Sequence, residues 1–139
     1  MTKQYGFEDT TYQAVGAYEG LVKVVDDFYT LMETLPEAAK IRAMHKPDLT
    51  ESRDKLVCFL SGWMGGPRIY ADKYGPISIP IAHKHILIDE ADRDAWLLCM
   101  KGALVKQKYP EALQSYLMKQ LYFPAERIRQ VSQASHKAP

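Results

Sequence analysis

The segment from Ile81 to Met100 contains most of the residues whose types and spacing could do chemistry. His83 and His85 form a His-x-His pair after a proline-broken loop, and Trp96 follows in a predicted helix. A neutral imidazole is a common metal ligand, and an indole N–H can only donate a hydrogen bond. The segment therefore offers a candidate metal ligand and a candidate donor toward whatever that metal binds.

The His-x-His pair alone leaves several interpretations open. On an extended segment both rings point the same way, as in some zinc sites, but a closed site needs two more ligands. The sequence has no Cys-x-x-Cys or His-x-x-x-His to supply them. A zinc protein would use His83, His85 and His45. In a cofactor-free helical interaction module, His83 would simply be exposed on an edge strand or a surface loop.

A third interpretation is a haem protein, because one neutral histidine facing a flat apolar cavity holds haem iron in an open form. The helices supply enough apolar residues to line such a cavity. The candidates are Phe28, Leu56, Phe59, Leu60, Met64, Ile86, Ile88 and Met100. The core of a plain helical bundle would use the same residues, so their spacing does not demand a cofactor.

Three polar aromatic residues, Tyr29, His45 and Trp96, are predicted to lie near apolar faces. Each is costly to bury without a hydrogen-bonding partner. Donors directed at a bound ligand would stabilise negative charge that develops on it. The alternative is that all three are boundary residues with their polar tips in water.

The elements expected to position these residues are all helices. Apolar residues at three- and four-residue steps predict a helix over 12–35 with a bend near Gly16 and Gly20. A second long helix over 50–64 is predicted to end at the Gly-Gly-Pro sequence of 65–67. Between the two, Pro36 ends the first helix or begins a short one.

The second half of the chain predicts two more helices after a long connection. Residues 65–80 contain three glycines and three prolines, yet their tyrosines and isoleucines favour an ordered loop. Asp89 is a predicted N-cap, and Pro110 begins a last helix that weakens beyond Pro124. Four substantial helices indicate an all-α fold of antiparallel pairs.

Composition sets limits on the partners and the domain organisation. The 139 residues are 47% hydrophobic and 25% charged, which fits one domain over 1–139 with polar or frayed ends at 1–11 and 125–139. A net charge of +1 gives no reason to expect a nucleic acid or a membrane as partner. The lack of a secretory or membrane-spanning apolar run leads us to expect a cytoplasmic protein.

Several stretches together resemble the group II truncated haemoglobins, small globins of bacteria and plants. They are FLSGWMGGPRIY at 59–70, the histidine at 83 and DRDAWLLCM at 92–100, with VDDFYTLMETLP at 25–36 and IRAMH at 41–45. The resemblance covers residues 10–123. It implies a two-on-two helical sandwich around haem b, in which the long loop replaces most of the helix before the iron ligand.

The resemblance also implies roles for individual residues. His83 matches the proximal iron ligand, Tyr29 matches the distal tyrosine that follows Phe28, and Trp96 matches the distal tryptophan. Ser52 falls where larger globins commonly have a distal histidine. Leu56, one turn later, is expected to face the haem.

Two positions depart from the pattern of many family members. His45 stands where Tyr or Phe is frequent, and it adds a titratable donor to the distal side. Ala82 precedes His83 where a basic residue often helps to hold a haem propionate. That role is then open to Lys84, His85, Arg68 and Tyr70.

By this resemblance the chain is expected to bind dioxygen, nitric oxide and carbon monoxide reversibly, with Tyr29, Trp96 and His45 donating hydrogen bonds to the ligand. The same pocket would suit nitric oxide oxidation or peroxide cleavage, because hydrogen bonding also polarises an O–O bond. A reductase is a candidate electron donor. The chain is expected to be a monomer or a weak dimer.

Overall fold

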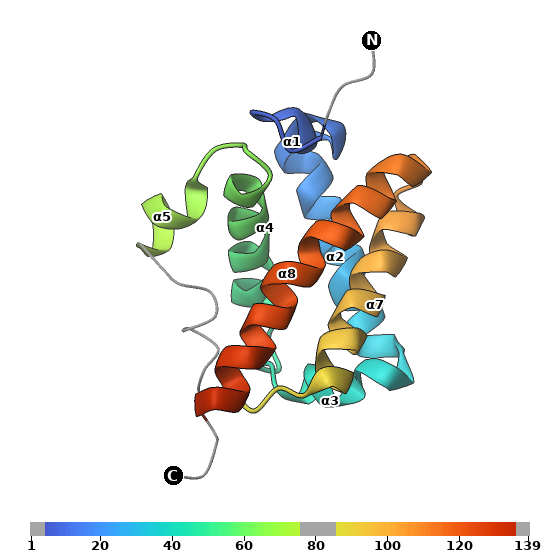
Figure 1. Cartoon of the computed structure of the whole chain (residues 1–139), viewed down its shortest axis with the longest axis vertical. Coiled ribbons are helices and arrows are strands. Elements are labelled where there is room, and N and C mark those ends of the chain that lie inside the picture. The colour runs from blue at the N-terminus through green and yellow to red at the C-terminus, as the bar shows by residue number, and fades with distance from the viewer. Residues whose placement is uncertain (1–4, 76–85, 136–139) are drawn as a thin grey trace.

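The computed structural model describes residues 5–75 and 86–135, and these form helices and no strand. The all-α prediction is therefore confirmed. Figure 1 shows the helices, which are α1 (Thr10–Ala14), α2 (Ala17–Thr34), the short 3₁₀ helix η1 (Pro36–Ala38), α3 (Ala39–Ala43), α4 (Thr50–Trp63), α5 (Ile69–Tyr74), α7 (Glu90–Lys106) and α8 (Glu111–Ser135). None of the described helices is long and apolar enough to cross a membrane.

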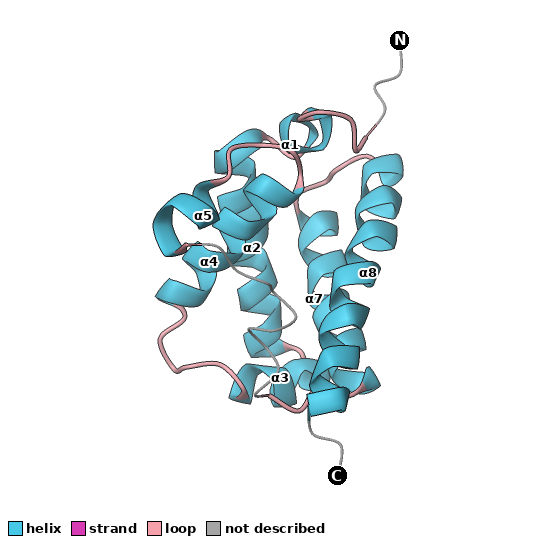
Figure 2. Cartoon of the chain, turned by 60° about the vertical axis from the view of Figure 1, so that its left-hand side comes forward, coloured by secondary structure: helices cyan, strands magenta, loops and turns pink. Residues whose placement is uncertain are grey.

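The long helices form two layers. α2 packs against α4 and also against α7, and α7 packs against α8. Only four residues connect α7 to α8, so these two helices run antiparallel side by side, as Figure 2 shows. The predicted two-on-two helical sandwich is confirmed.

The core centres on the inward face of α2. Leu21, Val25, Phe28 and Met32 recur at three- and four-residue steps, and each is almost completely buried. Burying an apolar side chain of this size stabilises the fold by about 1.5 to 3 kcal/mol. α2 therefore anchors both layers and fixes Tyr29, which follows Phe28.

The first turn of α7 is held by a capping box, which confirms the predicted N-cap. The Asp89 carboxylate accepts from the Asp92 backbone N–H at 2.9 Å, and the Asp92 carboxylate accepts from the Asp89 N–H at 3.0 Å. Lys40 of α3 lies 3.1 Å from the buried Asp92 carboxylate. These bonds fix the start of α7, and Trp96 lies one turn further along this helix.

α4 ends just before Gly65 and Gly66, as predicted. Gly65 is required there because the N-terminal segment packs closely against it. Gly65 has a φ of +87°, in the left-handed region that favours glycine. A Cβ at this position would lie 1.9 Å from the Glu8 carbonyl oxygen. The turn therefore lets the segment before α1 pack directly on the end of α4.

α8 is longer than predicted, because the sequence indicated a frayed end from residue 125. The helix continues through Pro124 to Ser135. Proline removes one backbone N–H donor and disfavours a helix interior. Tertiary contacts outweigh this cost: Ser132 is fully buried, and its hydroxyl binds the backbone of the segment that contains Ile86 and Ile88.

Part of the long connection is also helical. The sequence predicted an ordered loop over residues 65–80, whereas residues 69–74 form α5. α5 packs against α4 at the outer edge of the molecule, as both views show (Figures 1 and 2). This position brings Tyr70 to the site described next, whereas Tyr74 is exposed.

Candidate ligand-binding site

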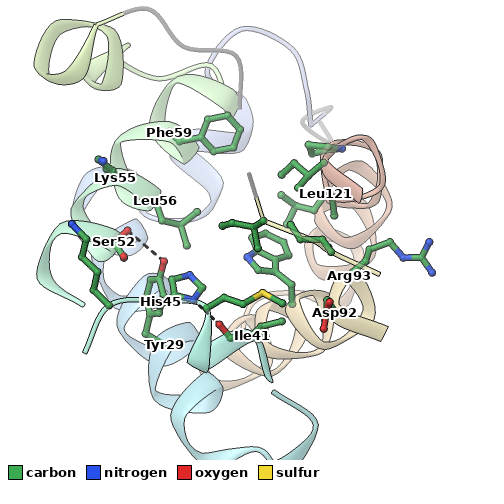
Figure 3. A pocket seen from close by; sticks show the side chains of 18 of the residues that line it. Tyr29, Ile41, His45, Ser52, Lys55, Leu56, Phe59, Asp92, Arg93 and Leu121 are labelled. Atoms are coloured by element: carbon green, nitrogen blue, oxygen red, sulfur yellow. Dashed lines mark hydrogen bonds between the residues drawn. The ribbon is translucent and has the colours of Figure 1, made fainter. Parts of the chain in front are cut away.

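A cavity of about 450 Å³ lies among α2, α3, α4, α7 and α8. Cavities that bind small molecules and cofactors commonly have volumes of about 300 to 1,000 Å³. Figure 3 shows the side chains that surround it. The lining consists of Tyr29, Ile41, Met44, His45, Lys46, Glu51, Ser52, Lys55, Leu56, Phe59, Tyr70, Ile86, Ile88, Asp92, Arg93, Trp96, Leu121, Pro124, Ala125 and Ile128.

Apolar side chains form two facing walls of this cavity. Leu56 and Phe59 project from α4, one turn apart, while Leu121 lies on α8 across the cavity (Figure 3). Ile86 and Ile88 line the cavity from the segment that leads into α7. The structure therefore places four of the apolar residues selected from the sequence at one site, and it adds a wall from α8.

Four other selected residues, Phe28, Leu60, Met64 and Met100, are buried in the hydrophobic core rather than in the cavity lining. Phe28 still contributes to the site. Its ring centroid lies 5.0 Å from that of Tyr29 and 5.1 Å from that of Trp96. Phe28 therefore supports both polar aromatic residues from behind.

Tyr29 brings a neutral hydroxyl to the cavity. The residue is 4% exposed, and its hydroxyl donates to the Ser52 carbonyl oxygen at 3.4 Å. Burial raises the pKa of Tyr29 to about 12, although the charge of Arg53 acts in the opposite direction. A 3.4 Å bond is long and weak. The hydroxyl can therefore turn toward a ligand at little cost.

His45 is held in a defined orientation by the helix turn before it. Its Nδ1 lies 2.7 Å from the Ile41 carbonyl oxygen, and a carbonyl can only accept. In the neutral ring the proton is therefore on Nδ1, and Nε2 is the acceptor nitrogen. The expectation that His45 donates to a ligand from Nε2 thus holds for the charged imidazolium and not for the neutral ring.

Trp96 enters the cavity from α7. Its ring packs on Phe28 at an interplanar angle of 61°. His45 and Tyr29 also meet, with ring centroids 5.8 Å apart. The three polar aromatic residues selected from the sequence therefore gather around one cavity, from α2, from the turn after α3 and from α7.

The cavity also carries charged groups that sequence analysis did not select. Glu51 lies 2.8 Å from Lys55 and 3.8 Å from Lys46, so one carboxylate faces two lysines. Arg93 is paired with Glu126 at 2.9 Å and packs over the Tyr122 ring. The lysine side therefore has an excess of positive charge, which suits a ligand that carries carboxylates.

The α8 wall was missed for a reason that can be traced in the sequence. Leu121, Ala125 and Ile128 follow helical spacing across Pro124, so the apolar stripe was present in the pattern. The sequence nevertheless predicts that the helix weakens beyond Pro124, because proline disfavours a helix interior. Ile41 and Met44 were missed because Ile41 lies on a five-residue helix and Met44 caps its end, and so short a helix shows no clear period.

Of the residues proposed to hold a metal or a carboxylate, His83, Lys84 and His85 lie outside the described residues. Tyr70 lines the cavity and is half-buried. Arg68 is exposed at the start of α5 and does not reach the lining.

The described part of the chain contains no cluster of three His, Cys, Asp or Glu side chains that could hold a metal. The zinc interpretation depends on His83 and His85 and is not tested by these residues.

A helical sandwich with an aromatic-lined apolar cavity is typical of the class of helical proteins that hold a ligand or cofactor between their helices. Comparison with known proteins identifies the family within this class. The sequence pattern of the bacterial-like globins matches residues 10–130. The group 2 truncated hemoglobin YjbI of Bacillus subtilis is 28% identical over 127 residues, 91% of this chain and 93% of that protein.

Solved structures agree with the sequence comparison. The group II two-on-two hemoglobin of Agrobacterium tumefaciens has a TM-score of 0.82 and 32% identity, over 93% of this chain and 98% of that chain. The truncated oxygen-avid haemoglobin of Bacillus subtilis has a TM-score of 0.77 and 30% identity, over 85% and 97%. The chain belongs to the bacterial-like globin family, as a group II truncated haemoglobin. Membership implies a haem cofactor and small diatomic gases as ligands.

Proposed function

We propose that the chain binds haem b in this cavity, with His83 as the iron ligand, and that it binds dioxygen reversibly with slow release. The observation that carries the proposal is the cavity, which combines apolar walls with hydrogen-bond donors. Haem supplies an iron with an open position for a diatomic ligand. The protein supplies the binding surface, the proximal ligand and the polarity around that position.

The lining fits haem, which is a flat apolar ring with two carboxylates. Leu56 and Phe59 on one side, with Leu121 on the other, would bury the two faces of the ring. Lys46 and Lys55 would face its carboxylates from the positively charged side, and the Tyr70 hydroxyl is a further donor. This assignment replaces Arg68 among the residues first considered for this role.

His83 is proposed as the iron ligand because it precedes Ile86, a residue that lines the cavity, by only three positions. The Ile86 carbonyl accepts from the Ser132 hydroxyl. Three residues of extended chain span at most about 11 Å. This short connection supports the proposed role.

Slow dioxygen release is proposed from the donors Tyr29 and Trp96. A hydrogen bond to a group that carries negative charge is worth about 1.5 to 3 kcal/mol, more than one to a neutral group. Neutral His45 would accept at Nε2, whereas its charged form would add a third donor. The Bacillus subtilis relative is described as oxygen-avid, which supports the same direction at 30% identity.

Peroxide reduction is a second candidate function. The donors that stabilise bound dioxygen would also polarise an O–O bond. Tyr70, which lines the cavity, contacts the exposed Tyr74, and this pair specifically favours the activity because it offers a path for electrons.

Haem titration into chain purified without cofactor tests the proposal. We expect Soret absorbance to rise to an end point at one haem per chain, and the reduced protein to change its spectrum reversibly between air and argon. A cofactor-free helical module predicts no saturable haem binding. A zinc protein predicts zinc by elemental analysis and no visible spectrum.

A further inference from the structure

Two tyrosines of α5 connect the cavity to the molecular surface. Tyr70 lines the cavity, and Tyr74 is 37% exposed. Their ring centroids lie 5.1 Å apart, within the distance of direct aromatic contact. An electron can therefore pass from the surface ring to the cavity ring without crossing a gap.

The Asp54 carboxylate is positioned to accept the phenolic proton of Tyr74. The Tyr74 hydroxyl donates to the Asp54 carboxylate, which also lies 2.9 Å from Lys73. Lys73 and Tyr74 hold the pKa of Asp54 below its usual range, so the carboxylate is ionised near neutral pH. Oxidation makes a phenol a far stronger acid than a carboxylic acid, and Asp54 can then take the proton.

The surroundings of the ring favour loss of this proton. The Lys55 ammonium lies 5.3 Å from the Tyr74 ring centroid. A cation over the ring opposes a second positive charge on it. Oxidation of Tyr74 therefore yields a neutral phenoxyl radical and not a radical cation.

Tyr29 lacks these features although it also lines the cavity. Its hydroxyl faces the Ser52 backbone carbonyl, which cannot hold a proton near neutral pH. The residue is 4% exposed, and burial opposes any charge left behind. Tyr109 likewise donates to a backbone carbonyl, that of Val15. Of the three tyrosines with a described hydroxyl partner, only Tyr74 therefore donates to a carboxylate that can take its proton.

We infer that Tyr70 and Tyr74 form a route for single-electron oxidation, by which an oxidant in the cavity draws electrons from phenols or aromatic amines that contact Tyr74. The inference rests on the proposed function, because the haem site with hydrogen peroxide would supply the oxidant. The ligand class follows from the exposed ring: a small aromatic reductant can stack on Tyr74 without entering the cavity.

One electron leaves Tyr74 through Tyr70, the O–H bond of Tyr74 breaks, and the proton passes to Asp54. A substrate phenol then gives one electron and one proton to the phenoxyl oxygen, which restores Tyr74, and Asp54 releases its proton to water. Hydrogen peroxide takes up two electrons and two protons to give two waters, so two substrate molecules are oxidised for each peroxide.

Electron paramagnetic resonance on the haem-loaded ferric protein, frozen after mixing with hydrogen peroxide, tests the inference. We expect a tyrosyl radical, a spin-trap adduct on Tyr74 by mass spectrometry, and loss of both in Tyr74→Phe. Tyr18→Phe is the matched control, because Tyr18 is 44% exposed and lies outside the cavity lining. Asp54→Asn should slow radical formation by on the order of 10²-fold, as for removal of a positioned proton acceptor.

Carbon monoxide difference spectra of each variant separate this inference from the proposed function. A normal Soret shift in Tyr74→Phe, with the radical lost and guaiacol oxidation reduced, supports the route. A normal shift with the radical unchanged in Tyr74→Phe, or with the adduct on another residue, overturns it while the haem site stands. Absence of a Soret band in the parent protein would contradict both.

Discussion

The Ser132 hydroxyl accepts a hydrogen bond from the Ile88 backbone N–H at 2.7 Å, and it donates to the Ile86 carbonyl in the same segment. Gln133 adds a bond to the Ile88 carbonyl at 2.8 Å. The end of α8 therefore holds the chain just after His83. A helix remote in sequence thus positions the segment from which the proposed iron ligand extends.

Ser132→Ala should loosen this segment. It leaves the partly buried Ile88 N–H without its serine acceptor, a cost of about 1 kcal/mol in the free energy of unfolding. Haem loss to a scavenger protein should become faster, because Ile86 and Ile88, which line the cavity, are held less firmly. Ser115→Ala, at an exposed position of the same helix, is the control. Equal haem-loss rates in the two variants would remove Ser132 from this role.

Trp96→Phe should speed dioxygen release. The substitution keeps an aromatic ring against Phe28 and removes the indole donor. Loss of a hydrogen bond worth about 1.5 to 3 kcal/mol corresponds to a rate increase of roughly 10- to 100-fold. Stopped-flow displacement of dioxygen by carbon monoxide measures it. Trp63→Phe is the control, because Trp63 lies outside the cavity lining, and it should leave the dioxygen dissociation rate as in the parent. An unchanged dissociation rate in Trp96→Phe would contradict the role of the Trp96 indole as a donor.

The stability of the fold should depend on Tyr29 at high pH. Burial raises its pKa in the folded state to about 12, above the ordinary value of 10.0. As the pH rises, the unfolded chain loses this proton first, so the contribution of neutral Tyr29 is present below pH 10 and is lost between pH 10 and 12. Between about pH 8 and about pH 11 the parent should lose about 1 kcal/mol more than Tyr29→Phe.

Urea unfolding at these two pH values checks the Tyr29 prediction. Part of the alkaline loss should remain in the variant, because burial also raises the pKa of Tyr109 to about 12. Identical losses in the parent and in Tyr29→Phe would mean that the Tyr29 hydroxyl is not buried as described.

Gly65→Ala should destabilise the fold by about 1 to 3 kcal/mol, because a non-glycine residue with positive φ is strained at about this cost. The close Glu8 carbonyl adds to this, since one of the two segments must move. Thermal unfolding measures the change. Gly62→Ala is the control, because Gly62 lies within α4 and a Cβ there would meet only ordinary contacts, 3.6 Å from Arg68, so it should cost less. Equal costs would show that neither the positive φ of Gly65 nor its Glu8 contact matters.

Much of the site could be predicted from the sequence because local patterns determine it. Trp96 follows the capping box that Asp89 and Asp92 form, and Tyr29 lies within a strongly amphipathic helix. The α8 wall could not be predicted, since Pro124 opposes helix locally and only contacts remote in sequence, such as Ser132 with Ile88, outweigh it.

The tautomer of His45 also could not be predicted from the sequence. Its type suggested a donor, whereas the Ile41 carbonyl one helical turn earlier assigns the proton to Nδ1. A tautomer depends on a distance between two atoms, and residue spacing alone does not give it. The same limit applies to Tyr70 and Arg68, which are neighbours in sequence but differ in whether they reach the cavity.

The most direct test of the central claim is the absorption spectrum of the reduced protein with and without carbon monoxide, compared with His83→Gly in the presence and absence of imidazole. The account predicts a Soret band that shifts with carbon monoxide in the parent, an altered or lost band in His83→Gly, and its restoration by imidazole. A parent spectrum that His83→Gly leaves unchanged would contradict the assignment of His83 as the iron ligand.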